Sequence, residues 1–426
     1  MNKKIGNLFK GDKVIWMVFF FLCVISIIEV FSASSTLTFK SQNYLGPIFY
    51  HVLMILIGLF VAIVTLNIPC RYFKIATPLL LVVSLIMLLW VLVGGESING
   101  ANRVIKLLPG ITFQPSEIAK GTMVLATAQI LSAMQREDGS GAAPQAMKFI
   151  LSLVLPFIIL IGIENLSTAA LLFAVIIMMM FLGRIPMHQM GKLIGVLSVL
   201  AGIFLVLTFT IGSMDKTDEE KEGKANGLVI TNNAQADHRK DEKSVFDVVT
   251  HRFGTWRNRV ISFFDKEDVP PEKYDLNKNF QVGHANIAIA SSGVIGKGPG
   301  NSTERDILPQ AFSDFIYAII IEEMGIIGAV VVVFLYIILL YRCARIARRC
   351  ENNFPAFLVM GLSLLLVVQA CINMMVAVEM MPVTGQPLPL ISKGGTSTII
   401  NCAYIGVILS VSRSAKRIQS ATQKSR

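Results

Sequence analysis

Repeated apolar segments, most of them long enough to cross a lipid bilayer, constrain what this chain can fold into. A bilayer core about 30 Å thick requires a spanning helix of about 20 mostly apolar residues. Of the 426 residues, 54% are hydrophobic and 15% are charged, which is too apolar for a soluble domain of this length. The sequence predicts an all-α polytopic membrane protein, a single domain over residues 1–426 with about ten transmembrane helices. The expected spans are 14–33, 49–68, 76–94, 116–134, 149–163, 166–183, 193–213, 311–341, 354–377 and 394–412.

The distribution of basic residues predicts the topology. The formal net charge is +10, but no basic run is interleaved with aromatic residues, so no nucleic-acid partner is expected. Nineteen Lys and Arg residues fall at the two termini and in alternate short loops, whereas four fall in the remaining short loops. Loops rich in Lys and Arg stay in the cytoplasm. Both termini are therefore expected there, including a basic cytoplasmic tail over residues 413–426.

Two regions leave alternatives open. The short fifth and sixth spans, 149–163 and 166–183, form either two crossing helices or one broken re-entrant pair. The segment 214–310 is expected to form a large extracytoplasmic loop between the seventh and eighth spans. Its first part, 214–245, is rich in Lys, Glu and Asn and is expected to be mobile. Residues 279–295 mix small and apolar side chains, which is typical of either a segment resting on the bilayer or a plain packed loop.

A first polar constellation lies at the outer start of the fourth span. Pro115 suits the first turn of a helix, because its missing N–H costs nothing there. Glu117 then lies near the positive end of the helix dipole, and Lys120 follows at i+3. The simplest interpretation is a helix start with an intrahelical ion pair. The alternative is that Arg103, Glu117 and Lys120 point into a polar cavity, because ionisable groups at membrane depth are costly.

Acidic residues mark the eighth span. Asp314 follows Pro309 and precedes a long apolar run, so it can be an ordinary helix cap. Glu322 and Glu323 lie inside that run, where ionisable groups are usually functional or paired with another helix. Eight helical residues would separate Asp314 from Glu322 by about 12 Å along the axis. The two acids could then line one cleft, but they would be too distant to share a proton.

A third constellation precedes the last span. Three prolines within residues 382–389 exclude a helix, and Gly394 and Gly395 open the last span. A glycine-rich turn at a helix N-terminus presents N–H groups that suit an anion, and Lys393 adds positive charge. The alternative is an ordinary interhelical turn. The segment GKGPGNSTE, residues 296–304, lacks the strand, the spacing and the Lys-Ser/Thr ending of a phosphate-binding loop, which argues against an NTPase.

Together these constellations resemble the SEDS family (shape, elongation, division and sporulation), the RodA/FtsW membrane proteins. The resemblance covers essentially the whole chain. Its most specific parts are FQPSEIAK (Phe113–Lys120), LPQAFSDFIYAIIIEEMG (Leu308–Gly325) and PLPLISKGGTS (Pro387–Ser397). It implies an enzyme, a peptidoglycan glycosyltransferase that polymerises lipid II into glycan strands. It also implies a multi-pass protein of the cytoplasmic (inner) membrane that uses an undecaprenyl-diphosphate-linked disaccharide as its donor substrate at the outer face.

The resemblance further implies roles for individual residues. Asp314 corresponds to the catalytic Asp, a general base, and is also the expected ligand of a divalent cation, Mg²⁺ or Mn²⁺. Glu322 is expected as a supporting acid. The substrate-binding residues expected from the resemblance are Arg103, Glu117 and Lys120, and the anion-suited turn described above adds Lys393, Gly394 and Gly395.

Within the family the chain resembles the division branch, FtsW, of the Bacteroidetes type. The segment Gly296–Phe315 lacks the extra residues usual in RodA, and Met381–Ser392 has the form found in those division proteins. A class B penicillin-binding protein transpeptidase and other divisome proteins are the implied partners. Three positions depart from the family pattern. Lys393 stands where Tyr is usual, Val104 where many members have Trp, and residues 164–168 where Pro-Asp-x-Gly-Thr is frequent.

Two other functions fit the same residues. A transporter that flips lipid-linked precursor would also show buried Glu117, Lys120 and Glu322 and a broken-looking pair of spans. It would need polar residues at several depths, whereas most of these cluster outward. A non-catalytic scaffold that positions another synthase predicts that the acids can be replaced without loss. The outward clustering favours the enzyme.

Overall fold

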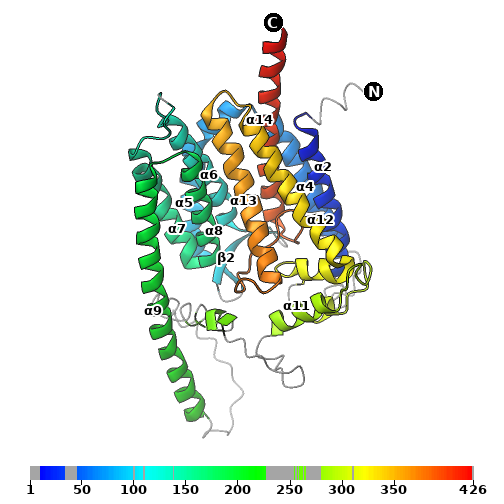
Figure 1. Cartoon of the computed structure of the whole chain (residues 1–426). Coiled ribbons are helices and arrows are strands. Elements are labelled where there is room, and N and C mark those ends of the chain that lie inside the picture. Colours follow the sequence, from blue (N-terminus) through cyan, green and yellow to red (C-terminus); the bar gives the residue numbers. More distant parts are fainter. Residues whose placement is uncertain are drawn as a thin grey trace. The chain divides into compact units, whose positions relative to one another are not determined.

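The computed structural model divides the chain into two compact units, Met1–Pro186 with Asp275–Arg426, and Met187–Tyr274. Figure 1 shows its helices and strands, coloured from the N-terminus to the C-terminus. The structure describes residues 10–33, 46–98, 101–108, 111–137, 139–226, 254, 257, 259–261, 263–264, 280–308 and 311–424.

The first unit is mainly helical. Its helices are α2 (Lys13–Ala33), α4 (Gly46–Asn67), α5 (Cys70–Gly94), α6 (Pro115–Ala133), α7 (Gln145–Glu164), α8 (Leu166–Leu182), α11 (Phe280–Ala290), α12 (Ile316–Ala347), α13 (Asn353–Ala377) and α14 (Thr396–Lys424). A 3-10 turn, η2, covers Glu304–Asp306. In the second unit α9 covers Met187–Asn226.

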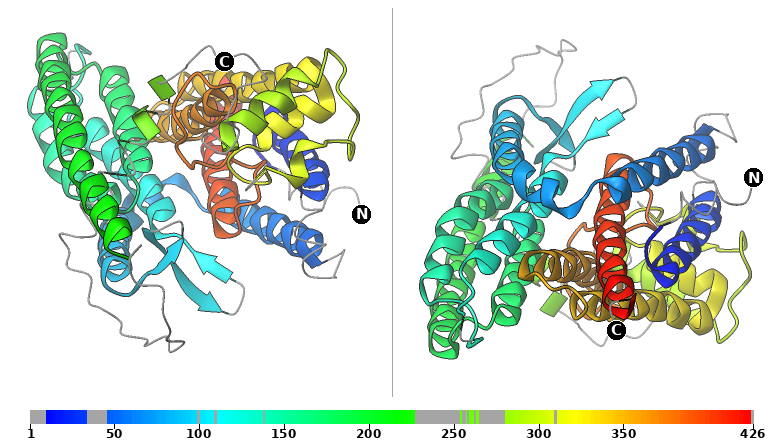
Figure 2. Two further views of the ribbon diagram at one scale, coloured as in Figure 1. Left: turned by 90° about the horizontal axis from the view of Figure 1, so that it is seen from below. Right: turned by 90° about the horizontal axis from the view of Figure 1, so that it is seen from above.

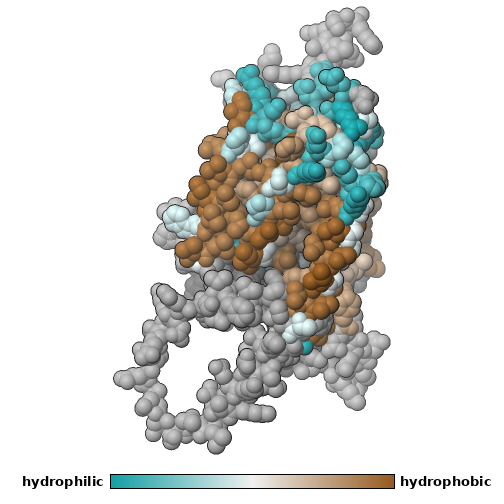
Figure 3. All heavy atoms as spheres, turned by 90° about the vertical axis from the view of Figure 1, so that its left-hand side faces the viewer, coloured by the Kyte–Doolittle hydropathy of each residue, from teal (hydrophilic) through white to brown (hydrophobic). Residues whose placement is uncertain are grey.

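A helix lies on each of the ten expected spans, which confirms the polytopic helical fold. Among the described residues, eight helices are long and apolar enough to cross a membrane. The other two are α8, which is apolar but shorter, and α6, which carries Glu117 and Lys120. One face of the molecule shows a broad apolar band, with hydrophilic side chains gathered at one end (Figure 3). Because the spans are identified by helix length and composition alone, the exact number of membrane crossings stays a prediction.

One boundary differs from the expectations, and two further expectations are compared with the structure here. The seventh span was expected to end at residue 213, but α9 continues to Asn226, because the following DKTDEEKEGKAN run is rich in helix formers and lacks proline. Most of the segment expected to be mobile, residues 227–245, lies outside the described residues. The fifth and sixth spans are two separate helices, joined at Asn165, whose side chain accepts a hydrogen bond from the N–H of Thr168 and caps α8.

A small antiparallel sheet occupies the segment between α5 and α6, where the sequence analysis expected only a loop. Its strands are β1 (Glu96–Ile98), β2 (Ala101–Leu108) and β3 (Ile111–Phe113), in the order β1-β2-β3. The sequence carries Asn-Gly between the first two strands and Pro-Gly between the last two, and both pairs favour tight turns. The sheet lies directly before Pro115, which opens α6 as expected.

Helix α13 organises the core of the first unit. It packs against α6, α8 and α12, while α14 packs against α4. The views along the helices show α14 beside α4 (Figure 2). Helix α11, within the segment for which two interpretations were open, packs against α12 and η2, and its His284 bonds to Glu304 at 2.6 Å. Residues 280–290 of this segment are thus a packed helix, and contact of the segment with the bilayer stays a prediction.

Helix α12 breaks at Gly325, which has a φ of 70° and a ψ of −170°. The break frees the carbonyls of Glu322 and Glu323, which accept hydrogen bonds from the N–H groups of Lys297 (2.9 Å) and Gly298 (2.8 Å). The two backbones approach so closely that a Cβ atom on Gly296 would lie 2.3 Å from the Glu323 carbonyl oxygen. The break at Gly325 therefore provides the carbonyls to which residues 297 and 298 bond.

This close approach makes Gly296 a sensitive position. Gly296→Ala is expected to destabilise the protein by about 3 kcal/mol, because a strained positive φ (+84°) adds to a collision with backbone. Gly293 is a matched control, since its φ is also positive (+63°) and nothing lies within 4 Å of an added Cβ. Gly293→Ala should cost only about 1 kcal/mol. Thermal unfolding in detergent measures both variants, and equal shifts would show that the approach is not a constraint.

Candidate active site

Asp314 lies in the turn directly before α12, which begins at Ile316 rather than near residue 311 as expected. The three consecutive carbonyls of residues 312–314 each accept a hydrogen bond from a different donor. The N–H of Lys393 donates to the first (3.0 Å), Ser392 Oγ to the second (2.6 Å) and Asn373 Nδ2 to the third (2.8 Å). The main chain around Asp314 is therefore held from α13 and from the loop before α14.

The carboxylate of Asp314 lies at the meeting point of this turn and residues 382–395, here called the 382–395 loop. Ser313 Oγ donates a hydrogen bond to Asp314 Oδ1 at 3.0 Å. A Cβ atom on Gly385, which has a positive φ of 68°, would lie 3.6 Å from Asp314 Oδ2. Because Asp314 is only partly buried, its carboxylate can meet a ligand that arrives from outside.

Glu117 and Lys120 form the intrahelical ion pair that the sequence analysis considered, at 2.8 Å, but not at the surface. Their side chains are 3% and 1% exposed. Lys120 Nζ also donates to Gln369 Oε1 at 2.8 Å, and Gln369 Nε2 donates to the carbonyl of Pro387 at 3.0 Å. The pair therefore lies beneath the 382–395 loop and connects to it through Gln369.

Lys393, Gly394 and Gly395 lie beside the Asp314 turn, at the entrance to α14. Lys393 Nζ lies 5.1 Å from the centre of the Phe312 ring, a cation–π contact. Burial lowers the pKa of Lys393 from its usual value. Gly395 has a positive φ of 51° and helix α14 starts at the next residue, so the glycine turn opens the last helix as expected. Arg103 is in β2, and its side chain lies outside the described residues.

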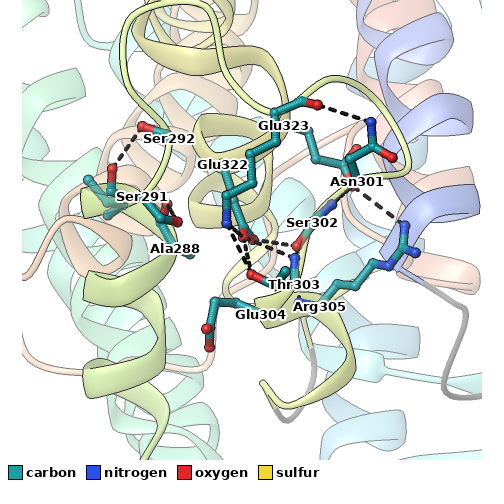
Figure 4. Close-up of polar contacts among 12 residues, drawn as sticks. Ala288, Ser291, Ser292, Asn301, Ser302, Thr303, Glu304, Arg305, Glu322 and Glu323 are labelled. Carbon is teal, nitrogen blue, oxygen red and sulfur yellow. Dashed lines mark hydrogen bonds and ion pairs between the residues drawn. The ribbon is translucent and has the colours of Figure 1, made fainter.

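Glu322 and Glu323 serve the outer loop before the Asp314 turn. Glu322 is fully buried, and its carboxylate pairs with Lys297 Nζ at 2.6 Å. It also accepts from the N–H (3.0 Å) and Oγ1 (2.9 Å) of Thr303 and from Ser302 Oγ. Figure 4 shows Glu322 beside Ser302 and Thr303. Glu322 thus supports residues 296–304. This agrees with the expectation that an ionisable group inside the apolar run is paired with another part of the chain.

The same contacts explain why the glycine-rich segment 296–304 is not a phosphate-binding loop. The N–H groups of Gly300 (3.1 Å) and Ser302 (3.3 Å) point at the Glu323 carboxylate, and that of Thr303 points at Glu322. These donors are occupied by carboxylates of the chain itself. An incoming phosphate would have to displace them.

Sequence analysis missed the amide side chains that join these motifs. Gln369 and Asn373 are both buried in α13, four residues apart and on one face. Asn373 Nδ2 donates to the carbonyl of Gln386 at 2.7 Å, and Gln386 Nε2 donates to Thr168 Oγ1 at 2.7 Å. Two polar side chains one turn apart in an apolar span were the available signal.

The residues around Asp314 fit a divalent cation that is shared with a ligand. Among the described residues, no group of three or more His, Cys, Asp or Glu side chains could hold a metal ion. The oxygen donors at hand are the Asp314 carboxylate and the Ser313 hydroxyl. Mg²⁺ is commonly bound by one or two carboxylates together with substrate phosphates. This donor set therefore suits an ion that arrives with a diphosphate, not an all-protein site.

Comparison with known proteins identifies the family. The "Cell cycle protein" family model, which spans FtsW, RodA and SpoVE, matches residues 12–234 and 243–417. The "Probable peptidoglycan glycosyltransferase FtsW" of Idiomarina loihiensis is 31% identical over 368 residues, 85% of this chain and 76% of that protein. The "Peptidoglycan glycosyltransferase MrdB" of Escherichia coli K12 is 26% identical over 417 residues, 96% of this chain and 95% of that protein.

Solved structures share the fold. A chain from "Structural coordination of polymerization and crosslinking by a peptidoglycan synthase complex" aligns with a TM-score of 0.67 at 22% identity, covering 95% of this chain and 98% of that chain. The rod shape determining protein RodA of Thermus thermophilus aligns with a TM-score of 0.60 at 21% identity, covering 96% and 98%. Of the three motifs that carried the resemblance, the second and third meet at the Asp314 turn, and the first is linked to the third through Gln369. This multi-pass membrane protein belongs to the FtsW/RodA/SpoVE family of cell cycle proteins.

Proposed function

We propose that this chain polymerises lipid II into glycan strands at the outer face of the cytoplasmic membrane, with Asp314 as the general base. The enzyme class, peptidoglycan glycosyltransferase, follows from the family, whose curated relatives carry that name. One observation carries the residue assignment. The partly exposed Asp314 carboxylate is set on a turn whose carbonyls are fixed by three separate hydrogen bonds.

In the proposed reaction Asp314 accepts the proton of the C4 hydroxyl of the acceptor sugar. The hydroxyl oxygen forms a bond to the anomeric carbon of the donor, and the bond from that carbon to undecaprenyl diphosphate breaks. The electron pair leaves with the diphosphate. A general base must reach its proton directly or through one water, so the acceptor hydroxyl has to lie next to the 382–395 loop.

Among the described side chains, Lys393 is a cation placed beside the Asp314 turn, where it can serve the leaving diphosphate. It is partly exposed, and its main chain is bonded to the Asp314 turn. A preorganised positive group stabilises charge that develops in the transition state. Asp314 and Ser313 would hold a divalent cation together with the diphosphate, and such an ion would offset the same developing charge. Contacts of Arg103, Glu117 and Lys120 with substrate stay predictions from the family resemblance.

We assign the chain to the division branch and expect a class B penicillin-binding protein as its partner. Relatives named FtsW, from Idiomarina, Geobacter and Halomonas species among others, support the branch. The similar solved structure belongs to a complex that coordinates polymerisation with crosslinking, which supports such a partner. Bacteroidetes-type ancestry and contacts with other divisome proteins stay predictions.

Polymerisation in detergent tests this function, because a micelle has no second compartment into which a precursor could be flipped. The purified chain with its class B partner is mixed with lipid II, with and without a chelator, and the products are separated by length. Glycan strands that disappear on chelation and return with Mg²⁺ or Mn²⁺ are expected. A folded complex that makes no strands would overturn the proposal. Flipping of fluorescent lipid II in vesicles would then distinguish a transporter from a scaffold.

A further inference from the structure

Asn373 on α13 has an unusual set of hydrogen-bond partners. Its side chain is 1% exposed, and Nδ2 donates both to the carbonyl of Asp314 (2.8 Å) and to that of Gln386 (2.7 Å). A primary amide has two N–H donors, and both are used here on main-chain acceptors. One buried side chain therefore ties the Asp314 turn to the 382–395 loop.

The hydrogen bond that a regular helix would give to this carbonyl is made elsewhere in α12. In a regular helix the N–H of Ala318 would donate to the carbonyl of Asp314. Here that N–H donates to the carbonyl of Phe315 instead, at 2.9 Å. The Asp314 carbonyl faces α13, so the bond from Asn373 helps to fix how the chain enters α12. The direction in which the Asp314 side chain leaves the backbone depends on the same dihedral angles.

A second hydrogen bond from α13 supports the one made by Asn373. Gln369, one turn before Asn373, donates to the carbonyl of Pro387, so the consecutive carbonyls of residues 386 and 387 are held by two amides on one face of α13. The same loop then returns to the Asp314 turn through the main chain of Lys393. The turn, the loop and α13 form a closed ring of hydrogen bonds.

We propose that Asn373 is a positioning residue for Asp314, an inference that rests on the proposed function and extends it. Asn373 does not touch substrate. It holds the main chain of Asp314 against the 382–395 loop, so that the carboxylate and Lys393 keep a fixed separation. Displacing a catalytic group by about 1 Å can cost about 100-fold in rate.

Asn373→Asp is the sharpest variant, because it preserves the shape but replaces the two N–H donors with a carboxyl group, which can donate at most one hydrogen bond to the two carbonyl oxygens. Asn373→Ser retains one donor and serves as a second variant if the first fails to fold. Ser363→Ala is the matched control. Ser363 is also fully buried on α13. Its hydroxyl donates to the carbonyl of Met360 in the same helix at 3.0 Å and meets the Cys343 thiol on α12, away from the Asp314 turn.

Two measurements on the complex with its class B partner test the proposal. Hydrogen–deuterium exchange is expected to rise together in peptides covering residues 311–320 and 382–395 in Asn373→Asp, and in neither peptide in Ser363→Ala. With lipid II, kcat is expected to fall 10- to 100-fold in Asn373→Asp while KM changes less than threefold. The kcat and the exchange of Asn373→Ser should lie between those of Asn373→Asp and the wild type.

The two measurements fail separately. If exchange in both peptides is unchanged, Asn373 does not hold the turn and the proposal is overturned. A change in KM with kcat preserved would also overturn it, because that result indicates binding rather than positioning. If exchange rises as expected but the wild-type complex makes no glycan, the failure lies in the proposed function and the hydrogen-bond role of Asn373 stands.

Discussion

Asp314→Ala and Asp314→Asn are both expected to reduce lipid II polymerisation by at least about 10²- to 10⁴-fold, the range for loss of a general base. The amide variant is the more informative of the two. It keeps the size of the side chain, and Ser313 and the three hydrogen bonds to the turn do not depend on the charge. Its thermal midpoint should stay within a few degrees of the wild type.

Glu351→Gln is the control for loss of an acidic group. Glu351 is exposed in the loop between α12 and α13, and its replacement should leave polymerisation unchanged. Rates are measured from glycan product formed by each variant in complex with the class B partner. A folded Asp314→Asn complex with near wild-type activity would remove Asp314 from the mechanism and favour the scaffold interpretation.

The helical architecture was predictable because each span can be identified from its own local sequence. A run of about 20 apolar residues needs no distant contact to identify it, and all ten expected spans became helices. The small sheet before α6 was missed although its turn pairs, Asn-Gly and Pro-Gly, are visible in the sequence. Strands β1 and β3 have three residues each, too few for a period-2 pattern to be recognised, and the eight residues of β2, ANRVIKLL, do not alternate strictly.

The candidate site was predictable as a set of motifs but not as an arrangement. Asp314, Lys393 and the glycine turn could be selected from local chemistry, and the structure places them side by side. Glu322 could be selected as an unusual acid, yet its partners lie about twenty residues earlier in a loop with no fixed spacing. Only the fold reveals that it supports that loop.

Gln369 and Asn373 show the limit most clearly. Each is a single amide in an apolar helix, and nothing in the local sequence says which carbonyls it will meet. Their partners, Lys120, Pro387 and Asp314, come from three distant segments that only tertiary packing brings together. Hydrogen bonds from side chains to main-chain carbonyls leave no mark on the sequence at the accepting residue.

Lys120→Met is expected to destabilise the protein by about 3–5 kcal/mol, because it leaves the Glu117 carboxylate buried without its partner. The pair is 2.8 Å apart with side chains almost fully enclosed, so water cannot replace the lost charge. The acceptor Oε1 of Gln369 loses its donor as well. Thermal or denaturant unfolding of the purified complex in detergent measures the loss.

The double variant Glu117→Leu/Lys120→Met separates a structural pair from a substrate-binding one. Replacing both partners of a buried ion pair with apolar residues of similar volume is often neutral, so most of the lost stability should return. About 1–3 kcal/mol should remain lost, because Gln369 still lacks a donor. If the pair only supports the 382–395 loop, the double variant should also regain much of its polymerisation activity. A double variant that folds well but makes no glycan would contradict this expectation and would favour direct contact of Glu117 or Lys120 with the substrate.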